Sequence, residues 1–78
     1  MTKPYHIKVC PLAARQLSSL TPKYQKMIIK LVEALAINPR PPGAKKIEGM
    51  IGLYSADIAT LRILYKVEDQ EVLLLVIK

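Results

Sequence analysis

Seventy-eight residues with a formal net charge of +6 are enough for one small domain, whose core is aliphatic because the chain has neither Trp nor Phe. No apolar run approaches the roughly 20 residues of a membrane span, and one Cys with one His make disulfides and metal ligation too sparse, so we expect a cytoplasmic protein without metal or cofactor. The first fifty residues hold nine Lys or Arg against two acids, which suits RNA, DNA or an acidic protein partner as well as a solvated surface.

The first half of the chain predicts one strand followed by two helices. Alternating apolar residues predict a strand over residues 4–9. Pro11 and Pro22 each open a helix, with Thr21 as the cap of the second, and Asn38 ends that helix. The second helix has a clear helical period of apolar side chains, at Tyr24, Met27, Ile28, Leu31, Val32 and Leu35. The short break between the two helices predicts an antiparallel pair.

The second half of the chain predicts strands separated by short turns. The expected strands cover residues 45–48, 53–58, 61–67 and 72–77. The last of them is six apolar residues without a break, which predicts a strand inside the sheet with both faces covered. Leu73 and Leu75 in this run are therefore expected to belong to the core. The elements predict an α+β fold of order β-α-α-β-β-β, with a mainly antiparallel sheet and an α-helical hairpin packed on one face.

Basic residues are the candidates for chemistry, because no cofactor motif is present. Arg62 stands alone on the polar side of an apolar strand, and Lys45 and Lys46 lie at the entry to another. Such side chains can hold a phosphodiester and stabilise the charge that develops during its cleavage, without a metal. The alternative is that they are solvated, as we expect His6 to be, while Cys10 is expected to be a small core residue.

Five segments, taken in order, carry a family resemblance that covers essentially the whole chain. They are Leu17-Ser-Ser-Leu-Thr-Pro-Lys-Tyr-Gln-Lys26, Leu35-Ala-Ile-Asn-Pro39, Lys46-Ile-Glu-Gly-Met50, Leu53-Tyr54 and Leu61-Arg-Ile-Leu-Tyr-Lys-Val67. Together they resemble the RelE/ParE toxin superfamily of type II toxin–antitoxin modules, and they are closer to RelE. The resemblance implies a single RelE-like toxin domain over residues 1–78, neutralised by a cognate antitoxin. It implies an mRNA interferase, which is an endonuclease acting on mRNA in the ribosomal A site, in the RelE branch and a DNA gyrase poison in the ParE branch.

The resemblance assigns the catalytic phosphate contact to Arg62, with Lys45 and Lys46 as further RNA contacts. The family has a basic residue directly after the Tyr of its third strand and often another two positions later. This chain has Ser55 and Asp57 at those places, and Asp57 is expected to repel a phosphate. The resemblance therefore implies that most of the catalytic cluster is replaced.

Two further departures concern the turn before Arg62 and the end of the chain. The usual Gly-acid-Tyr is replaced by Ala59-Thr60-Leu61, which also lacks the residues that a tight hairpin turn favours. Family members commonly continue past the last strand into a basic, Tyr-containing segment, whereas this sequence ends at Lys78. We therefore expect a RelE-type endonuclease that is weakly active or inactive. The alternatives are an antitoxin-binding module without catalysis and a ParE-like DNA gyrase inhibitor.

Overall fold

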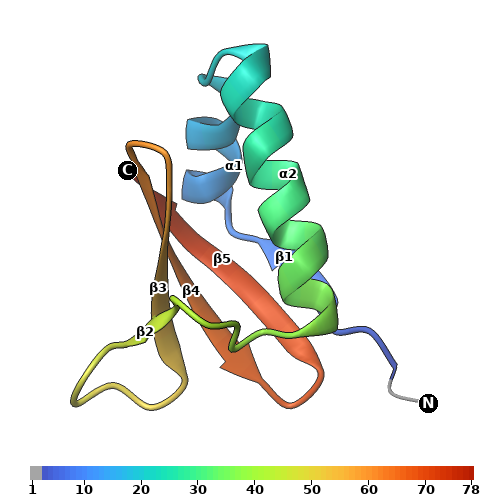
Figure 1. The fold of residues 1–78 in the computed structure, drawn as a ribbon, viewed down its shortest axis with the longest axis vertical. Coiled ribbons are helices and arrows are strands. Elements are labelled where there is room, and N and C mark those ends of the chain that lie inside the picture. The colour runs from blue at the N-terminus through green and yellow to red at the C-terminus, as the bar shows by residue number, and fades with distance from the viewer. Residues whose placement is uncertain (1–2) are drawn as a thin grey trace.

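A computed structural model describes residues 3–78, which form a five-stranded sheet covered on one face by two helices (Figure 1). The elements are β1 His6–Val9, α1 Pro11–Ser18, α2 Pro22–Ile37, β2 Lys45–Lys46, β3 Leu53–Ile58, β4 Leu61–Glu68 and β5 Glu71–Ile77. The predicted α+β class and the helical hairpin on one face are confirmed. The observed order is β-α-α-β-β-β-β, with the four strands predicted after the helices, and the strand predicted over residues 45–48 is reduced to the two residues of β2.

The two helices run antiparallel, as their short connection predicted (Figure 1). Each begins with a Pro in its first turn, where a missing N–H costs nothing. Thr21 is the N-cap residue of α2, as predicted, although its side chain makes no capping hydrogen bond. Its backbone carbonyl instead accepts the N–H of Gln25 at 2.9 Å. Ala13, Ile28 and Leu35 are the fully buried helical residues of this part of the chain.

The strand order β1-β5-β4-β3-β2 places the first and last strands of the chain side by side. β5 is parallel to β1 on one side and antiparallel to β4 on the other. The prediction that the terminal run is an internal strand is therefore confirmed.

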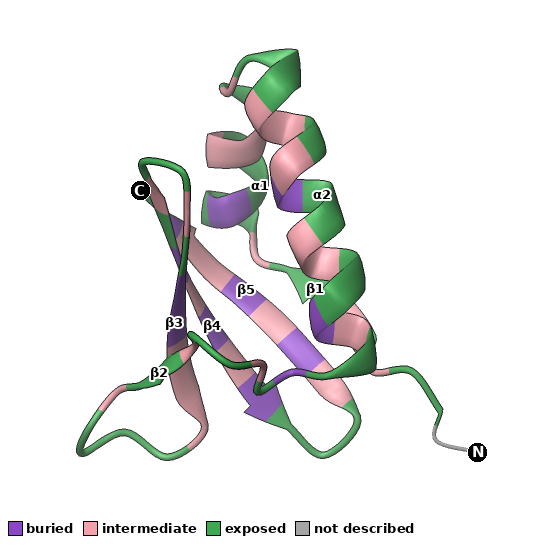
Figure 2. Cartoon of the chain, in the orientation of Figure 1, coloured by how far each residue is buried: buried purple, intermediate pink, exposed green. Residues whose placement is uncertain are grey.

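The core lies between the helices and one face of the sheet (Figure 2). Val72 and Leu74 of β5 face it and are at most 1% exposed. The opposite face, which carries Arg62 and Lys66 and which we call the open face, has no helix over it within residues 3–78. Leu73 and Leu75 lie on the open face and are only half-buried. The prediction that both faces of this strand are covered is therefore wrong, because the apolar run serves two different environments.

A bulge in β5 changes which side chains reach the core. The register with β4 shifts by one residue at Leu75. Strict alternation from Leu74 would bring Val76 and Lys78 to the core face. The extra residue instead brings Ile77 into the core, where it is 4% exposed. Lys78 consequently emerges on the open face.

Two tyrosines tie the Pro-rich loop at residues 38–44 to the sheet. The hydroxyl of Tyr65 donates a hydrogen bond to the carbonyl oxygen of Pro39 at 2.8 Å. Burial raises the pKa of Tyr65, so its hydroxyl stays protonated and remains a donor. Tyr54 stacks on Tyr65 with 5.8 Å between ring centroids, and its hydroxyl accepts a hydrogen bond from Arg40 Nε at 2.9 Å.

Candidate functional site: a cluster of cations on the open face

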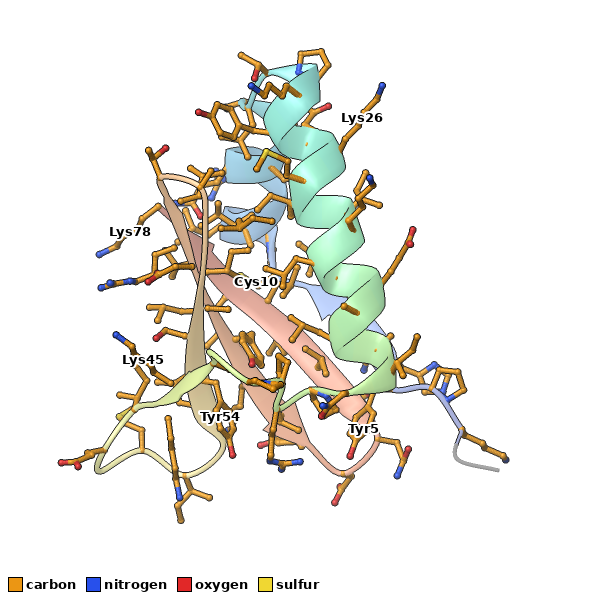
Figure 3. All side chains as sticks on the ribbon, in the orientation of Figure 1. Tyr5, Cys10, Lys26, Lys45, Tyr54 and Lys78 are labelled. Atoms are coloured by element: carbon orange, nitrogen blue, oxygen red, sulfur yellow. The ribbon has the colours of Figure 1, made fainter. Side chains whose placement is uncertain are left out.

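Strand pairing brings two of the predicted site residues to the open face. Asp57 pairs directly with Arg62 across β3 and β4, and Ser55 pairs with Lys45 across β3 and β2. Directly opposed residues share a face, and residues two apart on one strand share it as well. Lys45 and Arg62 therefore lie on the same face of the sheet. Figure 3 shows the side chain of Lys45 directed away from the helices.

Lys46 is separated from this pair by the same register. It pairs with Tyr54, whose ring stacks on the buried ring of Tyr65. Adjacent strand residues point to opposite faces, so Lys46 occupies the face that carries these tyrosines. The structure thus brings Lys45 to the face of Arg62 and leaves Lys46 on the other one.

Arg62 forms an ion pair with Asp57 on the neighbouring strand. Its Nε donates to Asp57 Oδ1 at 2.9 Å, and the two side chains are 59% and 53% exposed. This hydrogen bond lowers the pKa of Asp57, and the charge of Lys45 acts in the same direction. The same contact raises the pKa of Arg62. Asp57 was predicted to repel a phosphate. In the structure its carboxylate also accepts a hydrogen bond from the guanidinium of Arg62.

Lys78 is a further member of the cluster that sequence reasoning missed. Its backbone N–H and C=O bond those of Arg62 in both directions at 2.8 Å, which places the two side chains on one face. Both residues line a shallow hollow of about 410 Å³ together with Asp57 and the Ala59-Thr60 turn. Figure 3 shows the side chains of Lys45 and Lys78 pointing away from the helices.

The turn beside this hollow adopts the conformation that its residues disfavour. Ala59 has a φ of 53°, in the left-handed region that suits Gly or Asn better than Ala. Six cross-strand pairs between β3 and β4 hold the hairpin in register despite this turn. The ladder therefore fixes the position of Arg62 relative to Asp57.

The cluster has the chemistry of an anion site. Three cations, Lys45, Arg62 and Lys78, share the open face with the carboxylate of Asp57. A guanidinium presents a planar fork of N–H donors that matches a phosphate. The hydrogen bond between Asp57 and Arg62 lowers the pKa of the carboxyl and raises the pKa of the guanidinium, so it favours the charged form of both groups.

A second hollow on the open face is apolar. It measures about 680 Å³ and is lined by Gly49, Met50, Ile51, Leu53, Lys66, Leu73 and Leu75. Ile51 is 94% exposed and Met50 is 55% exposed. A contiguous apolar patch of this kind on a small domain indicates a surface for a partner.

His6 and Cys10 lie apart from both hollows. His6 is exposed on β1, and Cys10 is half-buried against the core with its thiol donating to the carbonyl oxygen of Leu75 at 3.0 Å. Residues 3–78 contain no group of three or more His, Cys, Asp or Glu placed to hold a metal ion. In the same part of the chain, no helix has the length and apolar character needed to cross a membrane.

Comparison with known proteins identifies the fold through solved structures. No protein-family description and no curated protein sequence matches the chain. The toxin–antitoxin complex RelBE2 from Mycobacterium tuberculosis contains a chain that is 24% identical, with a TM-score of 0.84 over 100% of this chain and 93% of that chain. The archaeal RelE-RelB complex from Pyrococcus horikoshii gives 24% identity and a TM-score of 0.87, over 96% of this chain and 93% of that one. The isolated E. coli RelE toxin gives 19% identity and a TM-score of 0.84, over 94% and 81%.

These structures define the class of fold to which the chain belongs. It has the fold of RelE toxins, from the first strand to the last. The resemblance to the RelE/ParE superfamily inferred from the sequence is confirmed at the level of the fold.

Proposed function

We propose that this chain is the toxin component of a type II toxin–antitoxin module of the RelE type, weakly active or inactive as an mRNA endonuclease. The observation that carries the proposal is the RelE fold over 94–100% of the chain, combined with a cluster of cations on one sheet face. Residues 1–78 act as one toxin domain, and they act in the cytoplasm because the proposed target is the ribosome with its mRNA.

A cognate antitoxin is the proposed partner. The solved structures are the toxin–antitoxin complex RelBE2 from M. tuberculosis and the RelE-RelB complex from P. horikoshii. On this chain, the apolar hollow offers Leu73 and Leu75 beside Lys66, and the formal net charge of +6 favours an acidic partner. An acidic amphipathic segment would cover the leucines and pair with Lys66.

Calorimetric titration with the product of the neighbouring gene tests the partner, which we expect to be a small acidic protein. We expect a Kd of about 1 μM or tighter, which corresponds to roughly −8 kcal/mol. Leu73→Asp should weaken binding by about tenfold or more, because it places a charge in the apolar hollow. Ile37→Asp is the matched control, since Ile37 is 78% exposed and lies outside that hollow. The absence of heat at millimolar concentrations would exclude this partner.

Cleavage of mRNA on the ribosome is the proposed activity, and Arg62 has the central role in it. Arg62 would hold the scissile phosphate and neutralise the charge that develops on it. Lys45 and Lys78 would contact neighbouring phosphates. Two residues of β3 slow the reaction, because Ser55 supplies no charge and Asp57 supplies a negative one.

Single-turnover cleavage on programmed ribosomes tests these roles. Arg62→Ala should lower the rate by about 10²-fold or more, by analogy with the loss of one electrostatic stabiliser. Ser55→Arg should raise the rate, because it returns a cation to the open face. Lys26→Ala on the exposed side of α2 is the control and should leave the rate unchanged. Undiminished cleavage by Arg62→Ala would place the active site elsewhere.

The same preparations separate the alternatives. Binding of the antitoxin without cleavage by any variant would identify an antitoxin-binding module, which the acid at Asp57 favours. Inhibition of DNA supercoiling by gyrase would instead assign the ParE-like activity. Neither outcome depends on the RNase residues of the open face.

A further inference from the structure

The carboxylate of Asp57 lies where the cations of the open face converge. It accepts the hydrogen bond from Arg62 Nε at 2.9 Å. Lys45 is near enough for its charge to act on the same carboxylate, and Lys78 lines the same hollow. An anion that binds Arg62 through its Nε–H would therefore need the donor that Asp57 already engages.

We propose that Asp57 is an internal ligand of this cluster, occupying the phosphate site of Arg62 until an RNA phosphate displaces it. This inference rests on the proposed function for the identity of the ligand. A guanidinium commonly holds a phosphate through two parallel N–H bonds, and the Nε–H of Arg62 is already given to Asp57. A phosphate brought to the same guanidinium would also meet the negative charge of the carboxylate. Asp57 and the phosphate therefore compete for Arg62.

Asp57 competes weakly for Arg62, but it always lies beside the phosphate site. Both side chains of the ion pair are more than half exposed, and exposed ion pairs contribute little. The backbone of Asp57 is fixed opposite Arg62 by the ladder of β3 and β4, so a displaced carboxylate stays beside the site. Asp57 therefore lowers the affinity for phosphate by a small factor and does not abolish binding.

Binding of a fluorescein-labelled oligouridylate of about ten nucleotides, followed by anisotropy at low salt, measures this factor. Asp57→Asn should bind about three- to fivefold more tightly than the unmodified chain, which is the scale of an exposed ion pair. Glu68→Gln is the matched control. It also removes one negative charge from an exposed pair, in this case with Lys66 at 2.7 Å, at the other end of β4. Its affinity should change by less than about 1.5-fold.

Repeating the measurement in an Arg62→Gln variant tells whether Asp57→Asn acts by freeing Arg62 or only by removing a negative charge. In Arg62→Gln, the gain produced by Asp57→Asn should fall to that of Glu68→Gln. The Nε–H signal of Arg62 in ¹H–¹⁵N spectra should shift when RNA is added, and it should shift in the same direction when Asp57 is replaced. A role of Asp57 confined to hairpin stability would leave RNA affinity unchanged.

Three results would overturn the proposal. They are equal gains from Asp57→Asn and Glu68→Gln, a gain that persists without Arg62, and an Arg62 Nε–H signal that does not respond to RNA. Each is independent of cleavage and of antitoxin binding. The experiments can therefore refute the role of Asp57 as an internal ligand without refuting the proposed toxin function, and the reverse.

Discussion

Leu73 and Leu74 are neighbours in β5 with the same side chain on opposite faces, and truncation of each measures what each face contributes. Leu74 is 1% exposed in the core, so Leu74→Ala should lower the free energy of unfolding by about 3–5 kcal/mol, from lost burial and the cavity left behind. Leu73 is half-buried beside an open hollow, so Leu73→Ala leaves no closed cavity and should cost about 1 kcal/mol. The two variants should therefore differ by about 2–4 kcal/mol in their free energy of unfolding.

Urea unfolding followed by far-UV circular dichroism gives both values. A chain of this size has a total stability of about 4–12 kcal/mol, so Leu74→Ala can leave a mixed population at 25 °C. Val72→Ala, at a position that is also fully buried, then serves as the milder core variant and should cost about 2 kcal/mol. Equal losses for Leu73→Ala and Leu74→Ala would refute the uncovered open face. Repeating the titration at a tenfold higher protein concentration tells whether a second copy covers Leu73.

Three further outcomes follow from the structure. Gly52→Ala should lower the free energy of unfolding by about 1–3 kcal/mol, because a Cβ at a φ of 74° would meet the carbonyl oxygen of Val67 at 2.7 Å; urea unfolding checks this. Tyr65→Phe should cost about 1–3 kcal/mol, since it leaves the buried carbonyl of Pro39 without its donor, and the same assay measures it. The lowered pKa of Asp57 means that its ion pair stabilises the fold above the unfolded pKa near 3.8 and loses this effect as the pH falls through the lower folded value. The melting temperatures of Asp57→Asn and the unmodified chain should therefore differ at pH 7 and converge in strong acid.

Local signals predicted most of the elements, because they depend on neighbours in the sequence. Pro11 and Pro22 mark the starts of both helices, and the strand predicted over residues 53–58 has the observed bounds. The sequence could also have predicted the pairing of Asp57 with Arg62. A two-residue turn at Ala59-Thr60 pairs positions equidistant from it, provided that Ala59 accepts a positive φ.

The remaining features depend on tertiary structure and have no local signature. The six apolar residues of the last strand do not reveal that helices cover only one face. The bulge at Leu75 reverses the alternation of side chains, so strict alternation assigns Lys78 to the wrong face. The separation of Lys45 from Lys46 follows from their register with β3, which the sequence alone does not specify.

The pairing of β1 with β5 affects when the protein can fold during its synthesis. Ile7 pairs with Val72, so β1 gains its neighbour only after more than sixty further residues have been made. Pairings of such long range slow folding, because a large loop must close before they form. Until β5 is made, the core beneath the helical hairpin lacks Val72, Leu74 and Ile77. Lys78 reaches Arg62 through the pairing of the same strand with β4, so the anion site does not assemble before residue 78 has been made.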